Sequence, residues 1–321
     1  MFDYEDTEEF QNRSSKLEYI RKETQVDPYP HKFMASHTLE EIVKEFDGEE
    51  IGDSEKAEKG ESPHVSLYGR LILFRAMGKN AFGQIQGEGF RVQVMFNRDN
   101  TTMDGFTPPD DPNQPKSALK FIEKKLDIGD ILGLEGHLFH THKGELTLYV
   151  KKSTLLCKTL LPLPEKHAGL VDKEIRYRKR WLDFISNPEN LNAFYIRSQV
   201  IKILRKCCDE EGFLEVETPI LQNIYGGANA QPFTTQINAL DHQEMFLRIS
   251  LEIPLKKLLV SGIPRVYEIG KVFRNEGIDR THNPEFTEIE MYAALWDYND
   301  MMLFIERAFE AIAKELFGKP H

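Results

Sequence analysis

The chain has few cysteines and no long apolar run. Its three cysteines are Cys157, Cys207 and Cys208, two of them adjacent. Adjacent cysteines rarely bridge, and no CxxC spacing occurs, so neither a disulfide framework nor a zinc site is predicted. No apolar run approaches the roughly 20 residues that a membrane span needs. The opening MFDYEDTEEF is acidic and lacks the basic start and apolar stretch of a signal peptide. We therefore expect a cytoplasmic protein with no membrane partner.

Basic residues are also fewer than acidic ones. Lys and Arg number 41 against 52 Asp and Glu, which gives a net charge of −11. This balance argues against a protein that coats nucleic acid through bulk charge, although local basic patches are present at 12–22 and 173–184. With 321 residues, 40% of them hydrophobic, the chain is long enough for two globular domains.

The first part of the chain predicts short helices joined by extended segments. Residues 12–24 predict one helix and residues 38–46 a second, with Thr38 as the N-cap of a capping box. The polar stretch 47–63 has no periodicity and predicts a loop. Residues 1–63 are thus interpreted as an N-terminal helical and extended segment.

Residues 64–158 change to a period of two. Three strand-like runs, a helix over SALKFIEKKL and two further strands follow one another. This is the order of an OB-fold, a small Greek-key barrel that binds oligonucleotides across one face. A small β-barrel of another kind is the alternative. Residues 159–188, first Pro-rich and then basic, predict a linker and a basic helix.

Residues 189–321 predict a second domain of helices and strands. Apolar residues recur at helical spacing from residue 190 until Gly212 ends the helix. A shorter helix is predicted between Ser250, as its N-cap, and Gly262. The predicted fold class is α+β, with an N-terminal OB-fold β-barrel followed by an antiparallel sheet.

The stretch VFRNEGIDRTHNPEFTEIEMY mixes charged and aromatic residues in a predicted hairpin. Antiparallel strands are expected over 266–276 and 284–292. Strand alternation then groups Glu268, Gly270, Arg274 and Glu276 with Phe286, Glu288, Glu290 and Tyr292 on one face. We call this face the platform. We expect Glu290 to lie opposite Gly270, where a ligand side chain has space to enter.

A nucleotide and an ammonium-bearing ligand would suit the platform. A guanidinium pairs with two phosphate oxygens at once, a phenyl ring stacks on a purine, and a carboxylate balances a buried ammonium. The alternative is a hairpin whose Arg and Glu side chains only form ion pairs. Spacing alone leaves both interpretations open.

Several stretches, in order, resemble one family. FRNEG followed by HNPEFTEIEMY resembles motif 2 of class II aminoacyl-tRNA synthetases. The form of the motif is similar to that of the bacterial-type lysyl-tRNA synthetase family, which belongs to the lysine, aspartate and asparagine subgroup. GFLEVETPIL resembles motif 1, which forms a homodimer. Also similar are KLEYIRKETQVDPYPHKF, EGHLFHTHKGELTLYV, LPLPEKHAGLVDKEIRYRKRW, GGANAQPF and LRISLEIPLKKL. The resemblance implies an anticodon-binding OB domain at 64–158 and part of a class II catalytic domain at 189–321.

The resemblance also implies roles for individual residues. Arg274 would be the catalytic cation at the α-phosphate of ATP, where charge develops as the adenylate forms. The implied ATP-binding residues are Arg274, Glu276, His282, Asn283 and Phe286, with the Phe286 ring on the adenine. The implied lysine-binding residues are Gly226, Gly227, Glu252, Glu290 and Tyr292. The carboxylates would face the ammonium, and the glycines would permit close backbone approach.

For the anticodon, the resemblance implies Phe74, Phe82, Gln84 and Glu135. Aromatic rings would stack on unstacked bases and polar groups would read base edges, with Glu135 the expected base reader. Phe74 is also compatible with the core of the barrel, since its apolar neighbours hide which face it occupies.

The implied function is that of a lysine–tRNA ligase, which activates L-lysine with ATP and transfers it to tRNA(Lys). Motif 3 and the Mg²⁺ ligands are not found in the sequence and are expected downstream, so no metal site is predicted in this chain. It is interpreted as the N-terminal, inactive part of a longer enzyme. The alternatives are a tRNA-anticodon-binding module without catalysis and a related enzyme that modifies an elongation factor but lacks an anticodon-binding domain.

Overall fold

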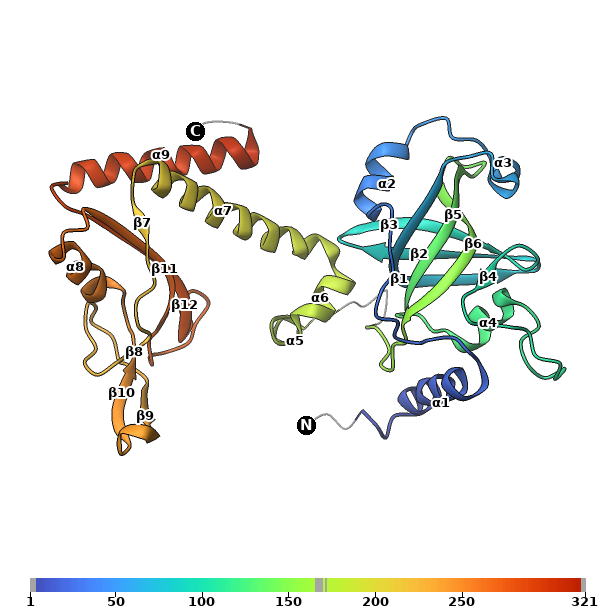
Figure 1. Ribbon diagram of the computed structural model, residues 1–321, viewed down its shortest axis with the longest axis horizontal. Coiled ribbons are helices and arrows are strands. Elements are labelled where there is room, and N and C mark those ends of the chain that lie inside the picture. Colours follow the sequence, from blue (N-terminus) through green and yellow to red (C-terminus); the bar gives the residue numbers. More distant parts are fainter. Residues whose placement is uncertain (1–3, 165–169, 171, 319–321) are drawn as a thin grey trace. The chain divides into compact units, whose positions relative to one another are not determined.

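The computed structural model describes residues 4–164, 170 and 172–318. Residues 165–169 and 171, within the predicted linker, lie outside the described residues. The chain divides into two compact units, residues 1–192 and 193–321, and each is described by itself (Figure 1).

A closed β-barrel forms the centre of the first unit. Its strands are β1 (His64–Met77), β2 (Asn80–Gly87), β3 (Phe90–Asn97), β5 (Ile131–His140) and β6 (Leu146–Cys157). They pair in the order β3-β2-β1-β5-β6, and a parallel pairing of β3 with β6 closes the barrel. The short β4 (Thr102–Met103) adds to β6, and α4 (Ala118–Lys125) follows β4 along the chain. The predicted OB-fold is confirmed.

Strand alternation builds the barrel core. Val65, Leu67 and Leu71 of β1 point inward with the alternating apolar residues of the other strands, and α4 adds Phe121 and Ile122. Fully burying an aliphatic or aromatic side chain of this kind contributes about 1.5–3 kcal/mol. The barrel therefore has a continuous core of its own.

Three helices precede the barrel: α1 (Glu8–Glu23), α2 (Leu39–Phe46) and α3 (Ser54–Lys59). The predicted capping box of α2 is present. The prediction of a loop throughout 47–63 is wrong, because this stretch contains α3. Asp53 caps that helix, and its Ala57 is buried against Met95 and Tyr149. A cap and one tertiary contact stabilise a helix too short to show periodicity in the sequence.

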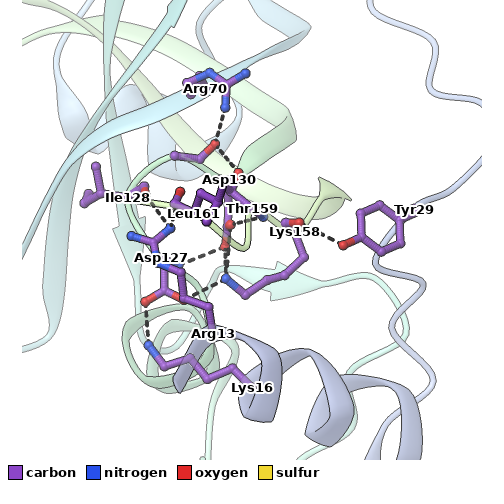
Figure 2. Close-up of polar contacts among 11 residues, drawn as sticks. Arg13, Lys16, Tyr29, Arg70, Asp127, Ile128, Asp130, Lys158, Thr159 and Leu161 are labelled. Carbon is purple, nitrogen blue, oxygen red and sulfur yellow. Dashed lines mark hydrogen bonds and ion pairs between the residues drawn. The ribbon is translucent and has the colours of Figure 1, made fainter. Parts of the chain in front are cut away.

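A buried ionic network ties α1 and the segment after β6 to the barrel (Figure 2). The fully buried Lys158 Nζ lies 2.7 Å from Asp127 Oδ2 and 3.0 Å from Asp130 Oδ2. Asp127 also pairs with Lys16 of α1 at 2.5 Å. Burial opposes the charge of Asp127, but hydrogen bonds from Lys158 and Lys16 outweigh it and lower the pKa of that carboxyl group. Burial raises the pKa of Asp130, against the attraction of Lys158.

The predicted basic helix at 173–184 is broken into α5 (Lys173–Arg178) and α6 (Arg180–Ser186). Lys179 between them leaves the helical conformation, with φ −118° and ψ 57°. The buried Asp183 of α6 accepts hydrogen bonds from Arg176 and Arg180. Asp183 of α6 thus forms an ion pair with Arg176 of α5, a contact that the sequence pattern did not reveal.

The second unit contains two small sheets and three α-helices among its described residues. Strands β7 (Leu214–Glu215), β11 (Arg265–Phe273) and β12 (Glu285–Ala293) form one sheet, with β11 and β12 antiparallel and β7 parallel to β11. Strands β8 (Leu221–Gln222), β9 (Thr234–Ile237) and β10 (Gln243–Leu247) form the other. The helices are α7 (Leu191–Glu210), α8 (Glu252–Val260) and α9 (Tyr298–Phe317).

The β11–β12 hairpin has helices on both faces. Cys208 and Phe304, from α7 and α9, pack with Tyr267 on one face. Leu255 of α8 packs with Val266 and Val272 on the other, beside Phe286 and Tyr292. The platform is therefore a partly covered face and not a solvated surface.

Candidate functional site

The β11–β12 register brings six of the eight platform residues together, all except Arg274 and Glu276. It pairs Val272 with Phe286, Gly270 with Glu288, Glu268 with Glu290, and Val266 with Tyr292. The prediction that Glu290 lies opposite Gly270 is wrong, because Glu288 occupies that position. The difference is two residues of register, which strand alternation alone cannot set and which leaves the faces unchanged.

Glu290 is held by three donors. Its Oε1 accepts hydrogen bonds from the Ser250 hydroxyl (2.7 Å) and the Leu251 N–H (2.9 Å), and its Oε2 accepts one from the Tyr292 hydroxyl (2.8 Å). Burial, and then the Glu290 carboxylate, raise the pKa of Tyr292, so the hydroxyl stays a donor. A carboxylate oxygen accepts two bonds, so Oε2 retains capacity for another donor.

Ser250 has a different role from the predicted one. The N-cap of α8 is Leu251, and the Ser250 hydroxyl accepts a hydrogen bond from the Glu252 N–H (3.1 Å) while donating to Glu290. The helix thus begins one residue later than predicted. The predicted helix end is confirmed by Gly262, with φ +99°.

Glu252 and the glycine loop meet at the start of α8. Glu252 Oε1 lies 2.5 Å from Lys256 Nζ, which in turn lies 5.7 Å from the Tyr292 ring centroid. Gly227 has φ +90°, and a Cβ there would lie 2.9 Å from both Glu252 Cβ and Ser250 Oγ. Glycine is needed at this position for both its conformation and its close approach.

Arg274 directly follows β11, and its side chain lies on the platform. Its Nε donates to the Ile249 carbonyl (3.3 Å), and its guanidinium carbon lies 5.1 Å from the Phe286 ring centroid. Its Nη2 lies 3.8 Å from Glu288 Oε2, and 32% of the side chain is exposed. A partly accessible cation is thus fixed beside an aromatic ring.

A buried ion pair that was not predicted from the sequence lies at the platform. Arg248 and Glu268 are almost fully buried and lie 2.6 Å apart, Nη1 to Oε1. The Arg248 guanidinium fills the space left by Gly270, where any Cβ would collide with it. The signal in the sequence is an arginine that stands between the apolar Leu247 and Ile249, directly after β10.

The remaining predicted ATP-binding residues lie in the hairpin loop. Glu276, His282 and Asn283 are exposed there, whereas Arg274 and Phe286 are in contact. His282 Nδ1 lies 2.8 Å from Asp279 Oδ2, and the Thr281 N–H, followed by His282, lowers the pKa of Asp279 to about 2. The structure therefore brings together only two of these five residues.

On the barrel, Phe82 and Gln84 share the outer face of β2, opposite the buried Ala81 and Ile85. Phe82 packs against the cluster of Met95, Phe139 and Tyr149. Gln84 is paired with Gln93, whose amide donates to the Thr147 hydroxyl (2.9 Å). Gln93 is not among the predicted anticodon residues, although its place in an alternating strand marks it as outward-facing.

The other two predicted anticodon residues lie elsewhere. Phe74 pairs with Gly83 on the inner side and packs on the barrel core, 6.0 Å from the Phe96 ring, which favours the core alternative. Glu135 pairs with Lys152 of β6. Only β1 lies between the strands of Glu135 and Phe82 in the sheet order, but Glu135 pairs with Ser66 near the start of β1 and Phe82 with Arg75 near its end, so the barrel does not bring these residues together.

Within the described part of the chain, no group of three or more His, Cys, Asp or Glu side chains could hold a metal ion. The same residues include no helix that is both long and apolar enough to cross a membrane. A cavity of about 930 Å³ in the second unit is lined by Gly226 and Ile253, among others, and its lining omits Arg274 and Glu290.

Comparison with known proteins gives two family matches and a set of close relatives. Residues 172–321 match the family described as tRNA synthetases class II (D, K and N), and residues 65–156 match the OB-fold nucleic acid binding domain. The chain is 58% identical to the lysine–tRNA ligase of Chlamydia pneumoniae over 97% of this chain and 58% of that protein. It is 46% identical to the Aquifex aeolicus lysine–tRNA ligase, over 87% and 45% of the two chains.

The chain spans less than two thirds of these relatives. A third relative, the lysine–tRNA ligase of Staphylococcus epidermidis, is 42% identical over 97% of this chain and 59% of its own length. Together with the closed barrel and the sheet-containing second unit, these matches show a domain of the class II tRNA synthetases (D, K and N) over residues 172–321 and an OB-fold nucleic acid binding domain over residues 65–156.

Proposed function

We propose that this chain provides the anticodon-binding domain and part of the lysine-activating site of a lysine–tRNA ligase. The observation that carries the proposal is the position of Glu290, a carboxylate held by three donors on the same face as Arg274. The identity to lysine–tRNA ligases supports the same assignment.

Two electrostatic roles follow for the platform. The remaining acceptor capacity of Glu290 Oε2 suits the ammonium of a lysine substrate, with the Tyr292 hydroxyl alongside. Glu252 is a second carboxylate for the same ligand. Its present partner Lys256 is 54% exposed, and such surface pairs are weak enough for a ligand ammonium to replace.

Adenylate formation needs no protein nucleophile. The lysine carboxylate attacks the α-phosphate and pyrophosphate leaves, so the protein contributes positioning and charge stabilisation. Arg274 is assigned to the developing charge on the α-phosphate, and the adjacent Phe286 ring to the adenine. Mg²⁺ has no ligand set among the described residues, so no step is assigned to it.

For tRNA(Lys), we assign the outer barrel face around Phe82 and Gln84 to anticodon bases, with Glu135 as a separate base contact. Stacking on an aromatic ring is worth about 1–3 kcal/mol per base. We further propose a cytoplasmic homodimer that assembles through α7 and β7, the segments similar to motif 1. Exposed Phe194, Ile196 and Leu214 support this assembly.

The test is lysine-dependent ATP–pyrophosphate exchange by the full-length protein, with all twenty amino acids compared. Glu290→Gln keeps the size of the side chain and removes its charge. Losing one partner of a buried charge pair costs about 2–5 kcal/mol, so we expect the KM for lysine to rise between about 30-fold and several thousand-fold. The KM for ATP should change much less.

Glu285→Gln is the matched control, since Glu285 is on the same strand but exposed and paired with Lys271 at 3.1 Å. It should leave both KM values unchanged. Exchange driven by another amino acid, or a normal lysine KM in Glu290→Gln, would contradict the proposal.

A further inference from the structure

Glu288 is the platform carboxylate to which the proposed function gives no role. It lies between Phe286 and Glu290 on β12, directly opposite Gly270. Its Oε2 is buried, and among the described residues no donor hydrogen-bonds to it. A buried oxygen left in this state costs about 1–3 kcal/mol and calls for an explanation.

The nearest cation is Arg274, whose Nη2 lies 3.8 Å from Glu288 Oε2. That distance is an electrostatic contact and too long for a hydrogen bond. The other nearby cation, Arg248, is committed to Glu268, to Thr218 and to the Lys271 carbonyl. Within the described part of the chain, Arg274 is therefore the one cation at ion-pair distance from Glu288.

The surrounding groups decide which carboxylate takes up a proton. From β12, Glu290 is satisfied by Ser250, Leu251 and Tyr292; from β11, Glu268 is paired with Arg248; and from α8, Glu252 is paired with Lys256. Burial, and then the Glu290 charge, raise the pKa of Glu288, while Arg274 opposes them. Glu288 is thus the carboxyl group of this cluster that is least favoured in its ionised form.

We propose that Glu288 is the resident counter-ion of Arg274, and that it takes up one proton from solvent when a nucleotide phosphate replaces it at the guanidinium. This inference rests on the proposed role of Arg274. In the empty site the carboxylate balances the cation. A bound phosphate neutralises Arg274 and adds negative charge nearby, which leaves an ionised Glu288 buried and unpaired. Protonation removes the charge of Glu288, and with it both the cost of burying an unpaired charge and the repulsion from the bound phosphate.

Proton uptake by Glu288 links ATP binding to pH in one direction. Because the bound state holds the extra proton, ATP binds more tightly as pH falls through the range in which Glu288 changes from ionised to protonated. One linked proton makes the Kd fall by up to tenfold per pH unit. Removing the carboxylate charge should give tight binding at every pH and remove this slope.

The experiment is calorimetric titration of the full-length protein with ATP, without lysine, in buffers of different ionisation enthalpy between pH 5.5 and 8. Proton uptake by the wild type minus that by Glu288→Gln is the readout. The ATP γ-phosphate also titrates in this range, but it contributes equally to both proteins and cancels. We expect a positive difference that approaches one proton, and an ATP Kd in Glu288→Gln that is several-fold lower at pH 8.

Glu288→Met is a second variant without a titratable group, and Glu285→Gln is the control that should retain the wild-type uptake. Equal uptake in the wild type and Glu288→Gln would overturn the inference, as would weaker ATP binding by both Glu288 variants. Normal lysine-dependent exchange in that case would leave the proposed function standing. Failure of the wild type to bind ATP would contradict both this inference and the proposed function.

Discussion

Replacing Lys158 with methionine is expected to destabilise the first unit by about 3–5 kcal/mol. Methionine approximates the length of the lysine stem but removes the ammonium, which is fully buried between Asp127 and Asp130 (Figure 2). The lysine–carboxylate network then changes from two cations and two anions to one cation and two anions, with Lys16 as the remaining cation.

The size of this destabilisation depends on which carboxylate is left without a cation. Asp127 keeps Lys16 and is slightly exposed, whereas the side chain of Asp130 is fully buried. Asp130 retains only the N–H donors of Thr159 (2.7 Å) and Asp127 (2.8 Å). An uncompensated buried charge of this kind would destabilise the fold by an amount near the upper end of the range given above. The two remaining hydrogen bonds to Asp130 reduce that cost.

The destabilisation caused by Lys158→Met should also depend on pH. Burial already raises the pKa of Asp130, and loss of Lys158 raises it further relative to the unfolded chain. A carboxyl group with a raised folded-state pKa destabilises the fold above that pKa and ceases to do so once it is protonated. The cost of Lys158→Met should therefore be largest near neutral pH and shrink as the pH falls.

Native-state hydrogen exchange, read by mass spectrometry on β5 and β6, measures the opening free energy of this unit without assuming two-state unfolding of the whole chain. Lys16→Met is the control. It removes a partly exposed partner of Asp127 and should cost about 0–1 kcal/mol. A loss below about 1 kcal/mol in Lys158→Met, or one independent of pH, would refute the reasoning.

Three further predictions concern the site, in the full-length protein. Arg274→Ala should lower kcat for exchange about 100- to 1,000-fold with a smaller change in KM, since its contact strengthens in the transition state; a pure KM effect would contradict this. Glu135→Ala should reduce kcat/KM for charging of tRNA(Lys) by about 1–3 kcal/mol and leave exchange unchanged, whereas a joint loss would make Glu135 structural. Gly227→Ala should raise the lysine KM at least tenfold with little change in melting temperature, because its Cβ would crowd Ser250 and Glu252; normal lysine binding would argue against the glycine loop as part of the site.

The sequence by itself determined the elements whose signals are local. Apolar alternation in β1 to β3 and the capping box of α2 depend on neighbouring residues, so the barrel order and that helix could be predicted. The platform was predictable in composition for the same reason, because alternation keeps Phe286 and Glu290 together, and they stay on the face of Arg274 for any register that differs by two residues.

Only the tertiary structure decided which groups meet across distant segments. The two-residue register that sets Glu288 opposite Gly270, the use of Ser250 by Glu290, and the filling of the Gly270 space by Arg248 depend on strand pairing and helix docking. Phe74 was ambiguous for a related reason, since the irregular register between Leu71 and Leu73 interrupts the alternation that would have assigned its face. Local patterns fix which side of an element a residue occupies, but hydrogen-bond partners are fixed by packing between elements far apart in the chain.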